Sequence, residues 1–121
     1  MAVFRMIVTD VDASVGFYTT HLGFTLDQQY GPAMAILSQG DLTLWLAGPM
    51  ASASKPMPDG TQPMPGGWNR IVLTVDDLAA TVARLRGAGA QFRNDIVTGP
   101  GGQQILLSDP SGNLLELFQA Q

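Results

Sequence analysis

Hydrophobic and polar residues follow two different periods along this chain, and each change of period marks a new element. Val3 to Val8 form a short, mostly apolar run that is typical of a strand, with Arg5 as its one polar residue. Asp10 suits the N-cap of a helix that ends at Gly23, because apolar residues recur between them at helical spacing. Those apolar residues are Val11, Val15, Tyr18 and Leu22. Three short strand-like runs follow, at about Thr25–Gln29, Ala33–Ser38 and Leu42–Ala47.

The same order of elements returns in the second half of the chain. Val75-Asp76-Asp77 aligns with Val8-Thr9-Asp10, so a strand at 71–75 precedes a helix that Asp77 caps and that Gly87 and Gly89 end. Further strands are predicted at about Gln91–Arg93, Gln103–Ser108 and Leu114–Phe118, separated by turns at 99–102 and 109–113. The sequence therefore predicts an α+β fold: a single domain over residues 1–121, built from two βαβββ modules at about 1–47 and 68–121.

A segment rich in proline and methionine, about residues 48–67, lies between the two modules. It holds five of the eight prolines and three of the six methionines. We interpret it as a surface linker; the alternative is a lid whose flexible methionines adapt to a ligand. Trp68 follows directly, and we interpret it first as a core residue and second as the wall of a binding site.

Charge and composition narrow the classes of partner. The chain is 45% hydrophobic with a net charge of −4, and its six Lys and Arg residues form no basic run, so we expect no nucleic-acid partner. The acidity favours a neutral or cationic small ligand. The absence of Cys excludes disulfides and thiolate metal sites. No signal peptide or membrane-spanning stretch is recognisable, so we expect a cytoplasmic protein with no membrane partner.

One carboxylate, Glu116, stands in the middle of the last apolar strand, where it is costly without a partner. The purely apolar sides of the two first strands, 4/6/8 and 71/73/75, are expected to lie under the helices. The opposite sides are then expected to line a mostly apolar cup. The candidate ligand-binding residues on that side are Val3, Arg5, Ile7, Leu42, Leu44, Leu46, Trp68, Arg70, Val72, Glu116 and Phe118.

With these elements and motifs, the chain resembles the vicinal oxygen chelate superfamily, which includes glyoxalase I, bleomycin-resistance proteins, extradiol dioxygenases and fosfomycin-resistance enzymes. The motifs that carry the resemblance are 8–10, Ser14-Val15-Gly16-Phe17-Tyr18, Leu22-Gly23-Phe24, 75–77 and Asp109-Pro110-Ser111-Gly112-Asn113 with Glu116-Leu117-Phe118. The resemblance implies two modules whose sheets curl into a cup, and a homodimer with two sites.

The resemblance also implies four metal-ligand positions, which fall here on Val3, Leu44, Arg70 and Glu116. Only Glu116 offers a metal ligand, so we expect no metal and no other cofactor, and neither glyoxalase I nor dioxygenase activity. We expect Arg70 instead to form a bidentate ion pair with Glu116. His21 is interpreted as a cation at the C-terminus of the first helix.

Three functions are compatible with this pattern. The favoured one is a metal-independent protein that binds a small, largely apolar molecule in the cup at a dimer interface, with sequestration of a drug or metabolite as its role. The alternative is a metal-free lyase or isomerase in which Arg70 acts as electrophile and Glu116 as general acid or base; these two residues are catalytic only in that case. The third is an interaction protein whose cup is filled by its own side chains.

Overall fold

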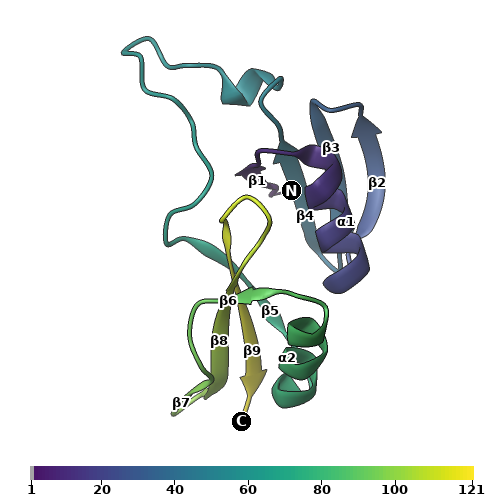
Figure 1. Ribbon diagram of the computed structural model, residues 1–121, viewed down its shortest axis with the longest axis vertical. Coiled ribbons are helices and arrows are strands. Elements are labelled where there is room, and N and C mark those ends of the chain that lie inside the picture. The colour runs from purple at the N-terminus through teal and green to yellow at the C-terminus, as the bar shows by residue number, and fades with distance from the viewer. Residues whose placement is uncertain (1) are drawn as a thin grey trace. The chain divides into compact units, whose positions relative to one another are not determined.

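The computed structural model describes residues 2–121 and confirms the α+β class, with two sheets and two α-helices within that range. The chain divides into two compact units, one ending at Pro65 and one beginning at Gly66 (Figure 1). Each unit contains one sheet and one α-helix, in the repeated order that the sequence predicts. Neither of these helices is long and apolar enough to cross a membrane.

The first unit is a four-stranded sheet with one helix. Its elements are β1 (Phe4–Ile7), α1 (Val11–His21), β2 (Thr25–Tyr30), β3 (Met34–Gln39) and β4 (Leu42–Ala47). The strand order is β1-β4-β3-β2, and only the β1–β4 pair of this sheet is parallel. The predicted cap is confirmed, because the Asp10 carboxylate accepts a hydrogen bond from the Ala13 N–H at 3.0 Å. Gly23, with φ of 74°, follows the last turn.

The segment after β4 is held by side-chain hydrogen bonds. It contains a short 3-10 helix, η1 (Ser52–Ser54), in which Ser54 donates to the Gly48 carbonyl and accepts at its own carbonyl from Gln62. Its three methionines are exposed: Met50, Met57 and Met64. In the same segment, hydrogen bonds from Thr61 lower the pKa of Asp59 below its ordinary value of 3.8. The backbone N–H of Thr61 has the larger effect and its hydroxyl the smaller.

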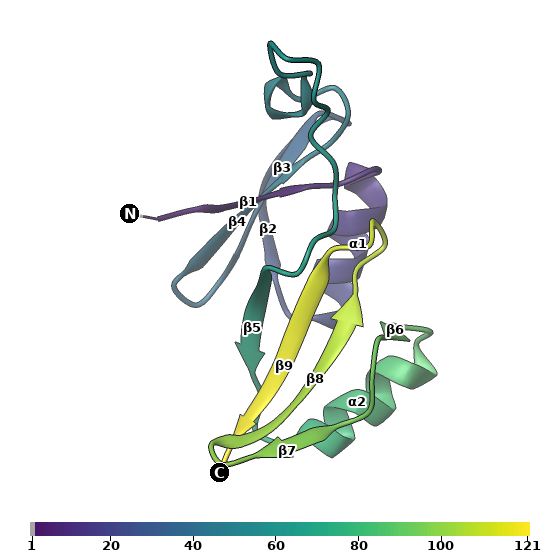
Figure 2. The ribbon, with the colours of Figure 1, turned by 90° about the vertical axis from the view of Figure 1, so that its left-hand side faces the viewer.

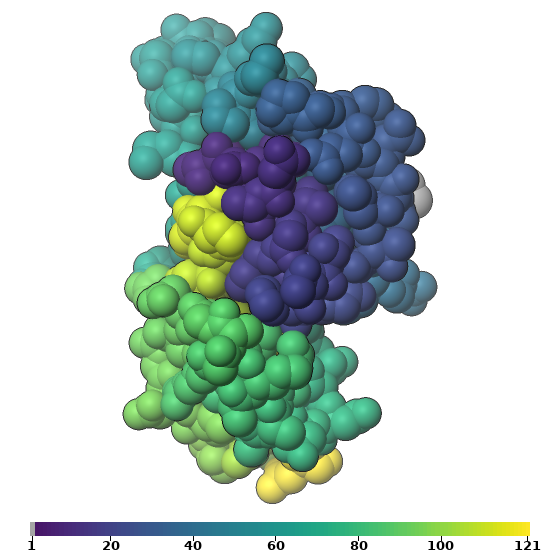
Figure 3. Space-filling view, turned by 45° about the vertical axis from the view of Figure 1, so that its right-hand side comes forward, coloured from purple at the N-terminus to yellow at the C-terminus, as the bar shows by residue number. Residues whose placement is uncertain are grey.

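The second unit repeats the arrangement with one extra strand. Its elements are β5 (Arg70–Thr74), α2 (Leu78–Gly87), β6 (Gln91–Phe92), β7 (Val97–Gly99), β8 (Gly102–Ser108) and β9 (Leu114–Ala120). The order is β5-β9-β8-β6, with β7 paired to β8, and Figure 2 shows β7, β8 and β9 side by side. Asp77 caps α2 as predicted, at 3.0 Å from the Ala80 N–H. Helix α2 (green) forms part of the visible surface of this unit in Figure 3.

The hydrophobic pattern does not predict β7, because three residues are too few to show a period. The turn at 99–102 is correctly predicted and joins β7 to β8 in a tight hairpin. Gly102 is required there: its φ is 150°, and a Cβ would collide with the carbonyl oxygen of Gln119 on β9. The hairpin thus depends on a backbone approach that only glycine permits.

Each helix covers one face of the sheet in its own unit, and we call the opposite face the open face. In the first unit the buried Tyr18 of α1 donates its hydroxyl to the sulfur of Met6 on β1 at 3.1 Å. In the second unit, both α2 and the strands bury apolar side chains. The buried residues are Leu78, Val82 and Leu85 on the helix, and Ile71, Leu73, Leu115 and Leu117 on the strands. The expectation that 4/6/8 and 71/73/75 lie on the covered side is therefore confirmed for Met6, Val8, Ile71 and Leu73.

One prediction about faces is wrong. Leu42, Leu44 and Leu46 do not share a face with Val3, Arg5 and Ile7, because β1 and β4 pair with Phe4 beside Leu44 and Met6 beside Leu46. Leu44 and Leu46 are fully buried on the covered face with Leu37 and Ala35 of β3. The open face of β4 carries Thr43 and Trp45 instead. The prediction was shifted by one residue, which moves every side chain of a strand to the other face.

Candidate functional site

The open face of the second unit brings together the predicted residues of β5 and β9. Val72 pairs with Glu116, Thr74 with Phe118 and Arg70 with Leu114, so that Arg70, Val72, Glu116 and Phe118 lie on one face. On the next strand, Leu106 pairs with Glu116 and adds an apolar side chain to this face. Val72 is 49% exposed although it lies in the middle of a strand. This face is therefore apolar, accessible within its unit and centred on one carboxylate.

Arg70 and Glu116 form the predicted ion pair. Both Nε and Nη2 of Arg70 lie 3.0 Å from the same carboxylate oxygen, Oε1 of Glu116. The expected bidentate fork is thus wrong in detail, because both donors converge on one oxygen and Oε2 accepts no hydrogen bond from residues 2–121. The Glu116 side chain is 8% exposed and the Arg70 side chain 31%. The pair therefore neutralises a buried carboxylate while the guanidinium reaches the surface.

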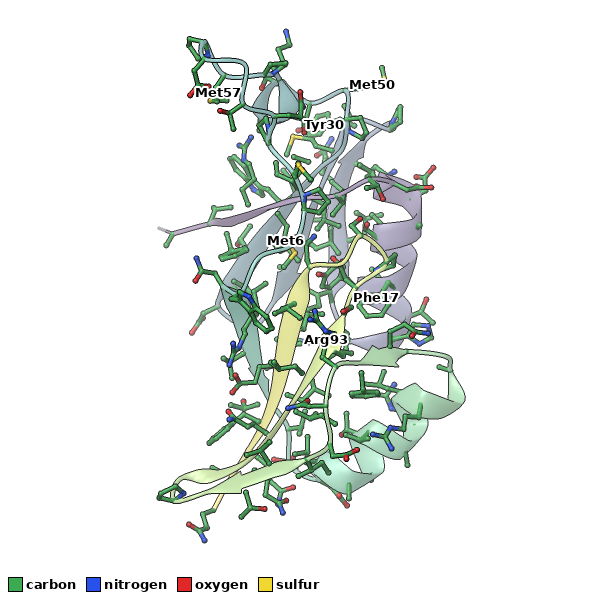
Figure 4. All side chains as sticks on the ribbon, turned by 60° about the vertical axis from the view of Figure 1, so that its left-hand side comes forward. Met6, Phe17, Tyr30, Met50, Met57 and Arg93 are labelled. Atoms are coloured by element: carbon green, nitrogen blue, oxygen red, sulfur yellow. The ribbon has the colours of Figure 1, made fainter. Side chains whose placement is uncertain are left out.

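The guanidinium also joins the pair to Trp68. Nη1 of Arg70 lies 3.4 Å from the Trp68 carbonyl oxygen, in a long hydrogen bond. Trp68 is 67% exposed among the residues that the structure describes, so its interpretation as a core residue is wrong. The guanidinium of Arg93, the residue after β6, lies 5.3 Å from the centre of the Trp68 ring. Arg93 is labelled in Figure 4. We call Trp68, Arg70, Arg93 and Glu116 the Trp68 cluster.

The turn before β9 holds the chain that leads into this cluster. The Asp109 carboxylate accepts hydrogen bonds from the backbone N–H groups of Ser111 and Asn113, at 2.9 and 2.8 Å, and from the Asn113 side chain at 3.1 Å. The Asn113 side-chain oxygen in turn accepts from the Gly66 N–H at 2.8 Å. Asp109 and Asn113 are both buried. The Asp-Pro-Ser-Gly-Asn turn thus fixes the backbone two residues before Trp68.

The open face of the first unit keeps Arg5 and Ile7 of the predicted set, with Val3 just before β1 on the same side by alternation. Arg5 pairs with Trp45, and its guanidinium lies 5.0 Å from the centre of the Trp45 ring. Ile36 of β3 pairs with Trp45 and lies on the same face. At the end of β2, Tyr30 is 52% exposed (labelled in Figure 4).

The sequence pattern does not identify Trp45 or Arg93 as residues of the binding face. The alternation in β4 does contain a signal for Trp45. If the purely apolar side of each strand lies under the helix, as predicted for β1, then Leu42, Leu44 and Leu46 are covered, and Thr43 and Trp45 lie on the open face. Within their sheets Arg5 pairs with Trp45 as Val72 pairs with Glu116. Trp45, and not Leu44, is therefore the counterpart of Glu116. For Arg93 no local signal exists, because its partner Trp68 lies at a distance in the sequence.

The side chains do not fit a metal ion. Of the four positions that the resemblance implies for metal ligands, only Glu116 carries a side chain that can bind a metal, and Arg70 places a positive charge on it. The other positions are Val3, Arg70 and, in place of Leu44, Trp45. No three His, Asp or Glu side chains within residues 2–121 gather closely enough to hold an ion. His21 lies in the last turn of α1, with its ring 5.9 Å from that of Phe17.

Comparison with known proteins identifies the fold. The model of the Glyoxalase/Bleomycin resistance protein/Dioxygenase superfamily matches residues 1–117. TnmS3, an antibiotic-binding protein from Streptomyces sp. CB03234, is 27% identical, with a TM-score of 0.70 over 100% of this chain and 97% of that one. Lactoylglutathione lyase from Agrobacterium tumefaciens is 20% identical, with a TM-score of 0.73 over 98% of this chain and 92% of that one.

The fosfomycin resistance protein FosX from Listeria monocytogenes has the same fold at lower identity. It is 14% identical, with a TM-score of 0.74 over 100% of this chain and 93% of that one. No protein with a curated function matches the chain by sequence.

Proposed function

Because the chain belongs to the Glyoxalase/Bleomycin resistance protein/Dioxygenase superfamily, we propose that it binds a small, largely apolar molecule on the open faces of its sheets, without a metal ion and as a homodimer. One observation carries the proposal: an arginine–glutamate ion pair stands where the resemblance implies metal ligands, on an apolar face that its own helix leaves uncovered. In this role the protein sequesters a drug or metabolite.

The make-up of the open faces supports binding. The side chains that surround the Arg70–Glu116 pair are Val72, Leu106 and Phe118, and those near Arg5 are Ile7, Ile36 and Trp45. A mostly apolar lining with a few placed polar groups is typical of small-molecule sites. The likeness to TnmS3, an antibiotic-binding protein, supports sequestration as the role.

The side chains at the implied metal positions support metal independence. An ion at Glu116 would have to displace the Arg70 guanidinium, which is itself no metal ligand. We expect elemental analysis of purified protein to find far less than one equivalent of Zn, Ni, Mn or Fe per chain. A chelator should leave the melting temperature unchanged, because an ion bound only to the native state would stabilise it by mass action. One equivalent of metal per chain would contradict the proposal.

A homodimer would cover the exposed apolar residues of these faces. Trp68 and Val72 of the second unit are 67% and 49% exposed, and Tyr30 of the first unit is 52% exposed; large exposed apolar side chains of this kind mark interaction sites. Light scattering should give the mass of two chains at micromolar concentration. The mass of one chain would contradict this part of the proposal without touching ligand binding.

The direct test is mass spectrometry of small molecules released from the purified protein. The variant Val72→Asp, which places a charge on the open face, should lose them. The matched control is Ala83→Asp, which adds the same charge on the exposed side of α2 and should retain them. The proposal fails if both variants retain the ligand equally, or if no small molecule accompanies the wild-type protein and none from an apolar compound library raises its melting temperature.

A metal-free enzyme is the second candidate, and a specific observation favours it. Oε2 of Glu116 accepts no hydrogen bond from the described residues, and Arg70 has N–H groups beyond the three that are engaged. Such a pair is able to move a proton at Oε2 while the guanidinium polarises a carbonyl. Turnover of the bound molecule by the wild type, abolished in Glu116→Gln with binding retained, would establish catalysis over sequestration.

A further inference from the structure

The arginines of this acidic chain are concentrated on its open faces. Three of its five arginines, Arg5, Arg70 and Arg93, lie there, although the net charge is −4. The strands carry only two carboxylates within residues 2–121: Glu116, which Arg70 neutralises, and Asp27 at the bulge of β2. The open faces are therefore positive in a protein that is negative elsewhere.

Arg93 has no acidic partner within the described residues. Its guanidinium lies over the Trp68 ring at 5.3 Å, and Arg5 lies over Trp45 in the same way at 5.0 Å. The two pairs arise from different positions, because Trp45 lies on β4 whereas Trp68 precedes β5. A guanidinium held by a cation–π contact, and not by a carboxylate, keeps its N–H groups available to an anion.

The surroundings of Arg93 carry a net positive charge that favours an anion. Arg70 is bonded to the carbonyl of Trp68, the same residue whose ring carries Arg93, so two guanidiniums and one carboxylate give the Trp68 cluster a charge of +1.

We infer that the ligand of the second unit is a planar molecule bearing a carboxylate or a similar oxygen anion, with Arg93 binding the anion and Trp68 contacting the flat apolar part. This inference rests on the proposed binding function and names its ligand class. It replaces the expectation of a neutral or cationic ligand that the net charge suggested. The whole-chain charge is a poor guide to these faces because most acidic residues lie in helix caps, turns and loops, whereas three of the five arginines lie on the open faces.

Two fluorescent probes of the same shape test the inference: 2-anthracenecarboxylate and its uncharged analogue 2-anthracenecarboxamide, with binding followed by fluorescence anisotropy. The wild type should bind the carboxylate about fivefold or more tightly than the carboxamide, because a charge-assisted hydrogen bond at an accessible site contributes on the order of 1 kcal/mol. Raising the salt from 25 to 250 mM should weaken the carboxylate alone.

Arg93→Gln should lower the affinity for the carboxylate about fivefold and change that for the carboxamide less than twofold. Arg93→Lys, which keeps the charge but not the planar stack, should lie between. Arg84→Gln removes the same charge from the exposed side of α2 and should leave both affinities within twofold. Circular dichroism of each variant confirms folding.

The outcomes separate the assignment of an anionic ligand from the proposed binding function. If the wild type binds both probes equally, or Arg93→Gln weakens both to the same extent, the anion assignment is overturned and the binding function stands. If neither probe binds saturably up to millimolar concentration, the anion assignment is overturned, and the proposed binding function is then decided by the mass spectrometry and the apolar compound library.

Discussion

Removal of Arg70 is the sharpest test of how the open face of the second unit is built. Arg70→Met keeps much of the side-chain volume but leaves the Glu116 carboxylate, which is 8% exposed, without its two donors at 3.0 Å. Breaking a fully buried ion pair costs about 3–5 kcal/mol. Because the Arg70 side chain is 31% exposed, water reaches this site, and we expect a smaller loss, about 2–3 kcal/mol.

The opposite change should cost less. Glu116→Leu leaves a guanidinium that already reaches the surface, so we expect a loss of about 1 kcal/mol. The double variant Arg70→Met with Glu116→Leu leaves neither charge stranded, and we expect it also to lose about 1 kcal/mol. The double variant should thus be more stable than Arg70→Met alone, with a coupling energy of about 2 kcal/mol.

Urea unfolding followed by circular dichroism measures these free energies, and calorimetry gives the melting temperatures. A loss of about 2–3 kcal/mol corresponds to a fall in melting temperature of roughly 8–12 °C for a chain of this size. Arg84→Met, on the exposed side of α2, is the matched control and should stay within about 0.5 kcal/mol of the wild type. A stabilising Arg70–Glu116 pair is refuted if Arg70→Met is as stable as this control, or if the double variant loses the sum of the two single losses.

Three further predictions concern local structure. Gly102→Ala should destabilise the protein by about 2 kcal/mol or more in urea unfolding, because its Cβ would collide with the Gln119 carbonyl; wild-type stability would disprove the strained geometry. Asp77→Ala should cost about 1 kcal/mol through loss of the α2 cap, while Asp77→Asn should keep most of it. Asp59 should titrate below 3.8 by NMR, so its small contribution to stability is present above that pH and is lost as the pH falls further; Thr61→Val, which keeps the backbone donor, should preserve most of the lowering.

The repeated order of strand and helix was readable from the sequence because it depends on local forces. The caps Asp10 and Asp77 bond to N–H groups three residues away, and the helical spacing of apolar residues is set within a single element. The pairing of Arg70 with Glu116 was foreseen from the resemblance to a known superfamily together with the cost of an unpaired carboxylate in an apolar strand.

The tertiary structure alone decided which residues meet on the open faces. In β4, three leucines alternate with threonine and tryptophan, so the pattern indicates which side lies under the helix but not which residues of β1 stand beside each of them. The pairing of Phe4 with Leu44 is what turns Trp45 outward beside Arg5. Trp68 was expected in the core because aromatic residues usually gain most by burial, yet it stands exposed under the Arg93 guanidinium. Both outcomes depend on residues far apart in the chain, and the free energy of such contacts exists only once the strands are paired in register.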